Sequence, residues 1–296
     1  MASAPVKTGP AKPGFDRHAR RKLINYVFVA LTSLATAIAV IALVMILYSL
    51  VAKGFGGINL ATFTTDQPGG GEEIGVGGLR NGLVGSLILC GVAMIISVVI
   101  GLLAGTWLAE YGDGNKLASV ARFLNDVLLS APSILIGLFV WLMIVAPFQG
   151  FSAMAGAVAL ALLATPVVTR TTEDILRLQS SALREAGMAL GAGKGFVIRK
   201  IIWRASSTGL VTGGLLGFAR ISGETAPLLF TAFGNPNLST SLFEPMGALP
   251  SVIFQYALSA DDNWRRLAWV AALLIATAVL SANIIGRHLA RRSASK

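Results

Sequence analysis

Long apolar segments dominate this sequence, and each is long enough to cross a lipid bilayer. They lie near residues 26–52, 83–109, 122–146, 151–169, 206–231 and 266–286. About 20 residues of helix cross a hydrocarbon core of about 30 Å, whereas an isolated strand would leave its backbone N–H and C=O groups unpaired in lipid. We therefore expect an all-α polytopic membrane protein with about six transmembrane helices.

The composition agrees with a membrane protein. Only 13% of the residues are charged, against about 25% in soluble domains. Residues 1–25 form a basic tail. Segment 26–52 is longer than the apolar core of a signal peptide, which has about 7–15 residues, so we expect it to be retained as the first transmembrane helix. The single cysteine, Cys90, lies in an apolar run, which predicts neither a disulfide framework nor a metal cluster.

The distribution of Lys and Arg predicts the orientation. With the N-terminus inside, 19 of the 24 basic residues fall in inside segments, 4 in outside segments and Arg220 within a span, as the positive-inside rule requires. Both termini, including tail 287–296, and loop 170–205 are then cytoplasmic, while the glycine-rich loop 53–81 and loop 232–265 are external. The net charge of +10 is thus a topology signal, and it calls for no nucleic-acid partner.

The cytoplasmic loop 170–205 holds the main functional motif. Small and apolar residues recur there at helical spacing and predict a short amphipathic helix that ends near Gly191, followed by a second helical piece over 196–203. Such a helix lets another protein approach closely; alternatively, it rests on lipid headgroups. The string GAGKG in this loop is not a P-loop, because Met188 stands where the first Gly is required and Gly195 where Ser or Thr is required. We therefore expect no cofactor and no enzymatic activity in this chain, with ATP and Mg²⁺ bound by another chain.

The same loop resembles the EAA motif of ABC importer permeases, which reads Glu-Ala-Ala, three residues, Gly, nine residues, Ile-x-Leu-Pro. Glu185, Ala186, Gly191 and Ile201 match at that spacing, Gly187 replaces the second Ala, and Trp203-Arg204 replace Leu-Pro. In that family the loop docks into a groove on the ATPase subunit, and the Gly makes the turn after the docking helix. The resemblance implies that Glu185 to Gly187, together with Gly191, couple this chain to an ATPase.

A second resemblance is narrower. Residues 217–232, GFARISGETAPLLFTA, are similar to the fifth-span signature of phosphate-specific ABC transport permeases, and the string at 223–228 favours their A subunit. Further similar stretches lie at 77–89, 105–112, 131–139, 169–174, 248–259 and 263–270. Together they cover about residues 75–286 and imply a type I ABC importer permease domain over 82–286.

This resemblance also implies a function and partners. The chain would form the pathway for inorganic phosphate with a paralogous permease, among the lipids of a prokaryotic cell membrane. Two ATPase subunits would drive it from the cytoplasm, and an external phosphate-binding protein would deliver the substrate. Two alternatives stay open: an ABC importer of another oxyanion or small solute, or an ion-coupled secondary transporter, which would need internal repeats and broken midplane helices.

Two charged residues lie inside the fifth apolar segment, Arg220 and Glu224. Four residues apart, they would share one face of a continuous helix. An Arg at the bilayer centre costs about 2.5–3.5 kcal/mol on insertion scales, so it should face a bundle interior or a wet cavity. Its guanidinium matches the geometry of a tetrahedral oxyanion, and Glu224 would be its counter-ion when the pathway is empty. In the alternative, the two residues only neutralise each other.

Arg170 lies at the cytoplasmic end of the fourth segment. There it anchors the topology or, by the family resemblance of the string TRTTED, helps phosphate to leave or pairs with Glu173. Pro132 and Pro227 are expected to kink or end helices. Glycines spaced four apart in the second and fifth segments predict close helix packing. They are Gly101 and Gly105, and Gly209, Gly213 and Gly217.

The predicted orientation is tested by cysteine labelling in a Cys90→Ala background. A Gly193→Cys variant should react with an impermeant reagent only from the cytoplasmic side, and a cysteine in loop 232–265 only from outside, because a charged reagent does not cross the hydrocarbon core. Labelling of Gly193→Cys from outside would overturn the topology and with it the docking role of loop 170–205.

Overall fold

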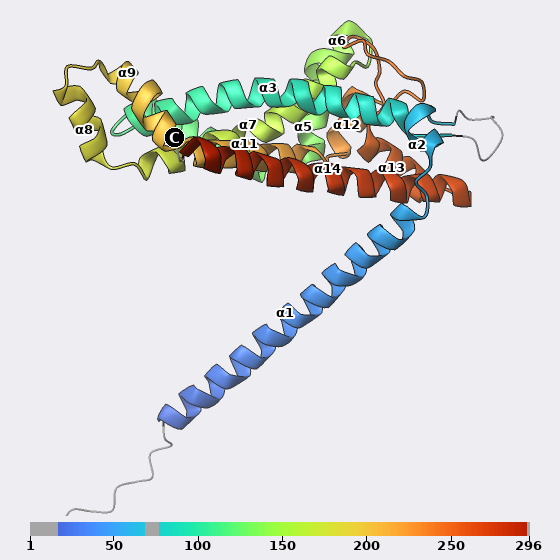
Figure 1. Ribbon diagram of the computed structural model, residues 1–296, viewed down its shortest axis with the longest axis horizontal. Helices are drawn as coiled ribbons and strands as arrows, with labels where there is room; N and C mark the ends of the chain where they lie inside the picture. Colours follow the sequence, from blue (N-terminus) through green and yellow to red (C-terminus); the bar gives the residue numbers. More distant parts are fainter. Residues whose placement is uncertain (1–16, 69–76, 295–296) are drawn as a thin grey trace, which may run out of the picture. The chain divides into compact units, whose positions relative to one another are not determined.

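A computed structural model describes residues 17–68 and 77–294, with side chains described for 19–68 and 77–288. All the elements within these ranges are helical (Figure 1). They are α1 (Arg17–Phe55), α2 (Leu60–Thr64), α3 (Arg80–Tyr111), α4 (Lys116–Ser130), α5 (Ser133–Val140), the π-helical turn η1 (Trp141–Val145), α6 (Ala146–Phe148), α7 (Ala153–Arg177), α8 (Ser181–Ala189), α9 (Lys194–Val197), the π-helical turn η2 (Ile198–Ile202), α10 (Trp203–Ala205), α11 (Ser207–Ile221), α12 (Ala226–Thr231), α13 (Leu249–Ala257) and α14 (Asp262–Ala294). The prediction of an all-α membrane protein is confirmed.

The chain forms two compact units, residues 1–51 and 52–296. The first contains most of α1, an apolar helix whose length suits a bilayer crossing. The second contains all the other helices. Its α8 and α9 lie at one end of the bundle, here called the α8 end, and α2 and α13 lie at the opposite end, here called the α2 end (Figure 1).

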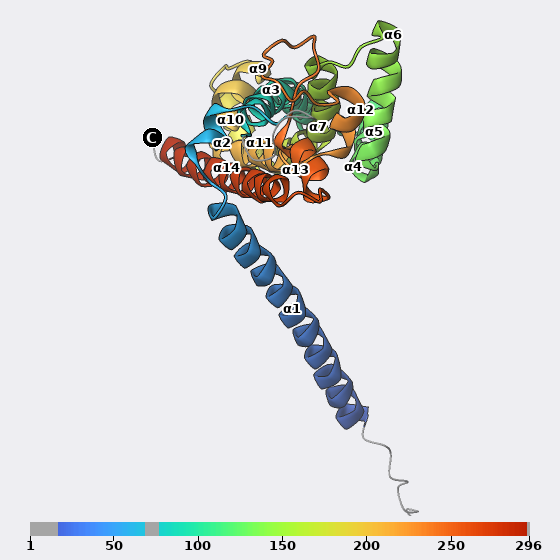
Figure 2. The ribbon, with the colours of Figure 1, turned by 90° about the vertical axis from the view of Figure 1, so that its right-hand side faces the viewer.

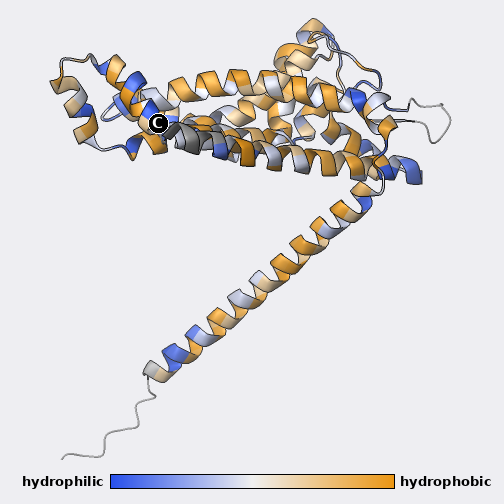
Figure 3. Cartoon of the chain, viewed as in Figure 1, coloured by the Kyte–Doolittle hydropathy of each residue, from blue (hydrophilic) through white to orange (hydrophobic). Residues whose placement is uncertain are grey.

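Four helices in the described ranges are long and apolar enough to cross a membrane, namely α1, α3, α7 and α14. The pair α4 and α5–α6 makes a fifth span if it is counted as one, although it bends by 106°. The bend falls at Pro132, as predicted, because proline has no N–H to continue the helix of α4. Figure 3 shows hydrophobic residues along α3 and α14, with hydrophilic residues gathered toward their ends.

The prediction of one continuous span over 206–231 is wrong. α11 ends at Ile221, and residues 222–225 separate it from α12. Pro227 lies in the first turn of α12, where its missing N–H cannot bond the carbonyl of Gly223, so a continuous helix is disfavoured at this point. The 15 residues of α11 extend over about 22 Å, less than the hydrocarbon core requires.

The central helix of the second unit is α7. In its most apolar stretch 67% of the residues are buried, against 22% in α3 and in α14. α7 packs against α3, α4, α5, α11 and α12, and Figure 2 shows α4 and α5 at one side of the bundle and α14 at another. The small alanines of α7 allow this crowding, because they let several neighbouring helices approach closely.

The predicted glycine contacts are confirmed. A Cβ atom placed on Gly105 would lie 2.6 Å from the carbonyl oxygen of Thr169 on α7, and one on Gly101 would lie 2.7 Å from Cβ of Val168. On α11, Gly209, Gly213 and Gly217 face α7 in the same way. These glycines let α3 and α11 approach α7 closely, and Gly101 of α3 and Gly217 of α11 both meet Val168.

The α3–α7 contact predicts opposite effects for two alanine substitutions on one helix. Gly105→Ala should lower the melting temperature of the purified protein, because its Cβ meets backbone that cannot move aside, and overpacking costs about 1–3 kcal/mol. Gly91→Ala on the same helix meets nothing within 4 Å and should raise stability, since alanine is favoured over glycine in a helix by about 1 kcal/mol. Equal melting temperatures for the two variants would contradict the contact.

Candidate functional site

Helix α8 forms an exposed element at the end of the bundle. Glu185 and Ala186 face solvent, whereas Gly187 is buried. A Cβ atom on Gly187 would come within 2.9 Å of Val197, so only a glycine lets α8 lie this close to α9. Gly191 follows the helix with a φ of +82°, the left-handed conformation that glycine adopts at helix ends. The predicted helix and turn are confirmed, and the outward face of α8 carries one carboxylate, several alanines and the exposed side chain of Met188.

A bidentate ion pair fastens α8 to α3. Nη2 of Arg184 lies 2.6 Å from Oε1 of Glu110, and its Nε lies 3.0 Å from the same oxygen. The side chain of Glu110 is only 3% exposed. The guanidinium also donates to the carbonyl of Leu176 at 2.8 Å and to that of Gln179 at 2.6 Å. The hydrogen bonds of Arg184 thus hold α8 in a fixed position relative to the last turn of α3.

Two further residues of the same loop bind the last turns of α3. Nζ of Lys194 donates to the carbonyl of Glu110 at 2.8 Å and lies 4.0 Å from the ring centroid of Tyr111. Nε1 of Trp203 donates to Oγ1 of Thr106 at 3.1 Å. A cation at this position satisfies a free carbonyl at the end of the helix and complements its dipole.

A second buried carboxylate, Glu173 on α7, holds two arginines. Its Oε1 accepts from Nε of Arg122 at 2.7 Å and lies 3.1 Å from Nε of Arg177. Its side chain is 4% exposed. Arg122 also donates to the carbonyl of Leu108 at 3.0 Å, and Arg177 reaches Asp113 at 3.0 Å. Glu173 thereby joins α3, α4 and α7 at the α8 end.

Arg170 does not pair with Glu173, contrary to one expectation. It lies 3.3 Å from Asp174 and 4.0 Å from Asp126 of α4. Arg170 is half-exposed and near the ends of α4 and α7. Arg170 pairs with Asp174 because the two residues are one helical turn apart on the same face of α7. The side chain of Glu173 instead points toward Arg122.

Arg220 and Glu224 do not share a helix face. Arg220 is the penultimate residue of α11, whereas Glu224 lies in the break before α12. Within the described residues no ion pair joins them, so the expected counter-ion pair is not formed. Arg220 is exposed and Glu224 is half-buried. An unpaired guanidinium on a helix of an apolar bundle needs water, a partner subunit or a ligand to solvate it.

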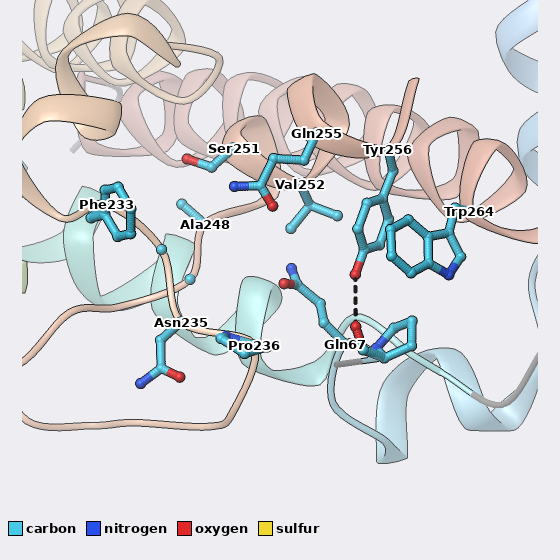
Figure 4. A pocket seen from close by; sticks show the side chains of 13 residues that line it. Gln67, Phe233, Asn235, Pro236, Ala248, Ser251, Val252, Gln255, Tyr256 and Trp264 are labelled. Atoms are coloured by element: carbon cyan, nitrogen blue, oxygen red, sulfur yellow. Dashed lines mark hydrogen bonds between the residues drawn. The ribbon is translucent and has the colours of Figure 1, made fainter. Parts of the chain in front are cut away.

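A cavity of about 300 Å³ opens at the α2 end, among residues 67–68, 233–256 and Trp264 (Figure 4). Gln67, Gln255 and Tyr256 point toward it (Figure 4), and Nε2 of Gln67 is buried without a hydrogen-bond partner among the described residues. Burial raises the pKa of Tyr256 to about 12, so the phenol stays neutral. None of the lining residues is charged. The cavity therefore lacks the cationic side chain with which proteins hold oxyanions.

At the same end, Asp66 binds both the start of α3 and the loop that follows α12. Its Oδ1 lies 2.9 Å from Nε of Arg80, and its Oδ2 accepts from the backbone N–H of Leu238 at 2.9 Å. The hydrogen bond from Arg80, which outweighs partial burial, keeps the pKa of Asp66 below its usual value. Nδ2 of Asn81 donates to the carbonyl of Asn235 at 2.6 Å.

Sequence reasoning did not identify the two buried carboxylates or their partners. Glu110 directly follows the second apolar segment, and a carboxylate at such a boundary signals a need for a cation. Which of several arginines pairs with Glu110 depends on the packing of α3 against α7, because this packing brings residues together that are distant in the sequence. In residues 17–68 and 77–294 no three His, Cys, Asp or Glu side chains are grouped as metal ligands.

An apolar helical bundle with four or five candidate spans in the described residues defines a polytopic membrane protein. A family model described as the binding-protein-dependent transport system inner membrane component matches residues 97–295. The chain belongs to this family, and PstA permeases are among its curated relatives.

The phosphate transport system permease protein PstA of Haemophilus influenzae is 48% identical over 267 residues, which are 90% of this chain and 94% of the relative. PstA of Xylella fastidiosa (strain Temecula1) is 44% identical over 275 residues, 93% of this chain and 95% of the relative. A solved structure of the MetNI methionine ABC transporter matches with a TM-score of 0.62 at 21% identity, covering 73% of this chain and 95% of that one. At this identity the structural match concerns the fold alone.

Proposed function

We propose that this chain is the transmembrane permease subunit of an ATP-driven importer of inorganic phosphate. It forms the pathway with a paralogous permease in the cytoplasmic membrane, with both termini inside. The observation that carries the proposal is the exposed helix α8 with its EAA-like residues, in a chain that is 48% identical to a phosphate transport permease over nearly its whole length. An external phosphate-binding protein delivers the substrate, and this chain binds no cofactor of its own.

The outward face of α8 supports docking of an ATPase, which binds the ATP and Mg²⁺. Glu185 and Ala186 are exposed, whereas Arg184 and Trp203 turn inward to α3. The exposed surface of α8 and its end combines Ala182, Ala186 and Ala189 with the apolar side chains of Met188 and Leu190. Small residues let a partner protein approach closely, and the apolar side chains suit a groove on that protein.

Arg220 supports an anionic substrate. It is exposed on the isolated subunit, at the end of α11 and next to the helix break, and no carboxylate neutralises it among the described residues. In an assembled pathway this face would meet the paralogous permease, and the guanidinium would then offer two parallel donors to phosphate. Glu224 in the break would stay separate, and Arg170 at the α8 end would assist release.

Gly191 and Gly193 provide a matched test of the docking loop. Gly191→Val should reduce co-purification of the ATPase and phosphate uptake, because a φ of +82° costs a β-branched residue about 1–3 kcal/mol. Gly193 has a φ of −65° and open space around it, so Gly193→Val should behave like the wild type. Glu185→Lys, which reverses charge on the docking face, should also release the ATPase. Wild-type ATPase yield and transport in both Gly191→Val and Glu185→Lys would rule out the docking role.

Arg220 is tested by uptake of labelled phosphate into vesicles that hold the complete transporter. Arg220→Gln should lower uptake by about 10-fold or more while the partner permease still co-purifies, since hydrogen bonds to a charged group contribute about 1.5–3 kcal/mol. Arg220→Lys should recover part of it, because an ammonium lacks the bidentate geometry. Arg265→Gln, the same change at an exposed arginine that pairs with Asp262 in the first turn of α14, is the control and should transport normally.

Two outcomes would change the proposal. Normal uptake by the double variant Arg220→Gln, Glu224→Gln would exclude a substrate role and restore the view that the two charges only neutralise each other. Sulfate that stimulates the ATPase as well as phosphate does would move the function to another oxyanion.

A further inference from the structure

We propose that α3 transmits displacements between the ATPase-docking helix α8 and the loops at the α2 end. In this proposal the Glu110–Arg184 ion pair is the connection between α8 and α3. The inference rests on the proposed function, because it concerns how α8 acts once an ATPase has docked. It assigns Glu110 and Arg184 as positioning residues, which touch neither phosphate nor nucleotide.

Three side chains of the loop bind one short stretch of α3. Arg184, Lys194 and Trp203 bind α3 between Thr106 and Tyr111, through two side chains and one backbone carbonyl. These three residues come from three different parts of the loop. Any displacement of α8 and the segment that follows it is therefore applied to the same end of α3.

The opposite end of α3 is fastened to the other face of the protein in the same manner. Arg80 binds Asp66, and Asn81 binds the carbonyl of Asn235. One turn further along, Oγ of Ser86 accepts from the backbone N–H of Leu249 at 2.8 Å, and Gly85 lies directly against the carbonyl of Gly247. α3 thus contacts the neutral cavity region at one end and the docking loop at the other.

Continuity distinguishes α3 from its neighbours. Its 32 residues contain no proline and extend over about 48 Å. The α4–α5 pair bends by 106°, α7 contains Pro166, and α11 ends at a break. The uninterrupted helix α14 packs against α11 and α13, and none of its described residues has a hydrogen bond or ion pair with loop 178–206. A stiff helix with fixed contacts at both ends is suited to transmit a displacement.

The rival route is α7, because it continues through residues 178–180 directly into α8. A substitution at Glu110 distinguishes the two routes, because it breaks the ion pair between α8 and α3 and leaves the covalent connection between α8 and α7 intact. Asp113 provides the matched control. It is a carboxylate three residues further along, its side chain is 88% exposed, and its ion pair is with Arg177 of α7 at 3.0 Å.

The experiment compares Glu110→Gln with Asp113→Asn in the complete transporter with its binding protein. It measures phosphate transported per ATP hydrolysed. Glu110→Gln should lower this ratio by about fivefold or more, because the coupling between two sites of a protein typically changes affinity by about fivefold at the least. The ATPase should still co-purify. Asp113→Asn should keep the wild-type ratio. The double variant Glu110→Gln, Arg184→Gln should lower the ratio no further than Arg184→Gln alone, because the contact between Glu110 and Arg184 is already lost in the single variant.

A second readout reports the far end of α3. In a Cys90→Ala background, a cysteine at Leu238 should change its labelling rate when ATP hydrolysis is trapped, and this change should disappear in Glu110→Gln but persist in Asp113→Asn. A merely structural role for Glu110 would lower yield and melting temperature without removing the response. If Glu110→Gln fails to assemble, Arg184→Lys keeps the charge, loses the bidentate geometry and should give an intermediate ratio.

The outcomes distinguish this inference from the proposed function. Failure of the unaltered chain to bind an ATPase would defeat the proposed function itself. Normal transport per ATP and a normal Leu238 response in Glu110→Gln would leave the proposed function standing and assign the transmission to α7.

Discussion

Backbone contact between α3 and α7 is the interaction on which the rest of the bundle depends. Helices in a bilayer gain little from hydrophobic burial against one another, so their association relies on close packing of small residues. Gly101 and Gly105 bring α3 to within direct contact of α7, and the alanines of α7 leave room for α11 on another side. The loop contacts at both ends of α3 have fixed positions only because α3 itself is held in this way.

Charged groups are arranged by a complementary rule. The middle of the bundle packs through glycine and alanine, whereas the buried carboxylates Glu110 and Glu173 lie at one end, and each is held by arginine. Removing one partner of such a pair typically costs about 3–5 kcal/mol, because a buried charge is left uncompensated. The pairs therefore fix which helices meet at the α8 end. Arg220 has no carboxylate partner among the described residues. It is therefore the best candidate for a side chain whose charge is paired with a ligand or a partner chain.

The helix break between α11 and α12 explains where sequence reasoning succeeded and failed. Apolar composition alone favours one span over 206–231, yet Pro227 removes the hydrogen bond that would carry the helix across Gly223. The sequence predicts that Pro227 ends or kinks a helix, but the spacing of the two charges does not reveal that this break separates Glu224 from the helix of Arg220. Once the helix stops at Ile221, the four-residue spacing to Arg220 no longer places the two charges on one face.

By itself, the sequence determined the all-α class, the short helix α8 with its glycine turn, and the glycines that pack closely against a neighbouring helix. Each of these depends on local pattern: apolar length, helical period, or the absence of a side chain. The tertiary structure alone decided the ion pairs. Arg184 and Glu110 are 74 residues apart, and several arginines near the α8 end carry the same charge. Their choice of partner is set by distance in the folded bundle, because a buried carboxylate is stabilised only by the cation whose helix brings it within hydrogen-bonding reach.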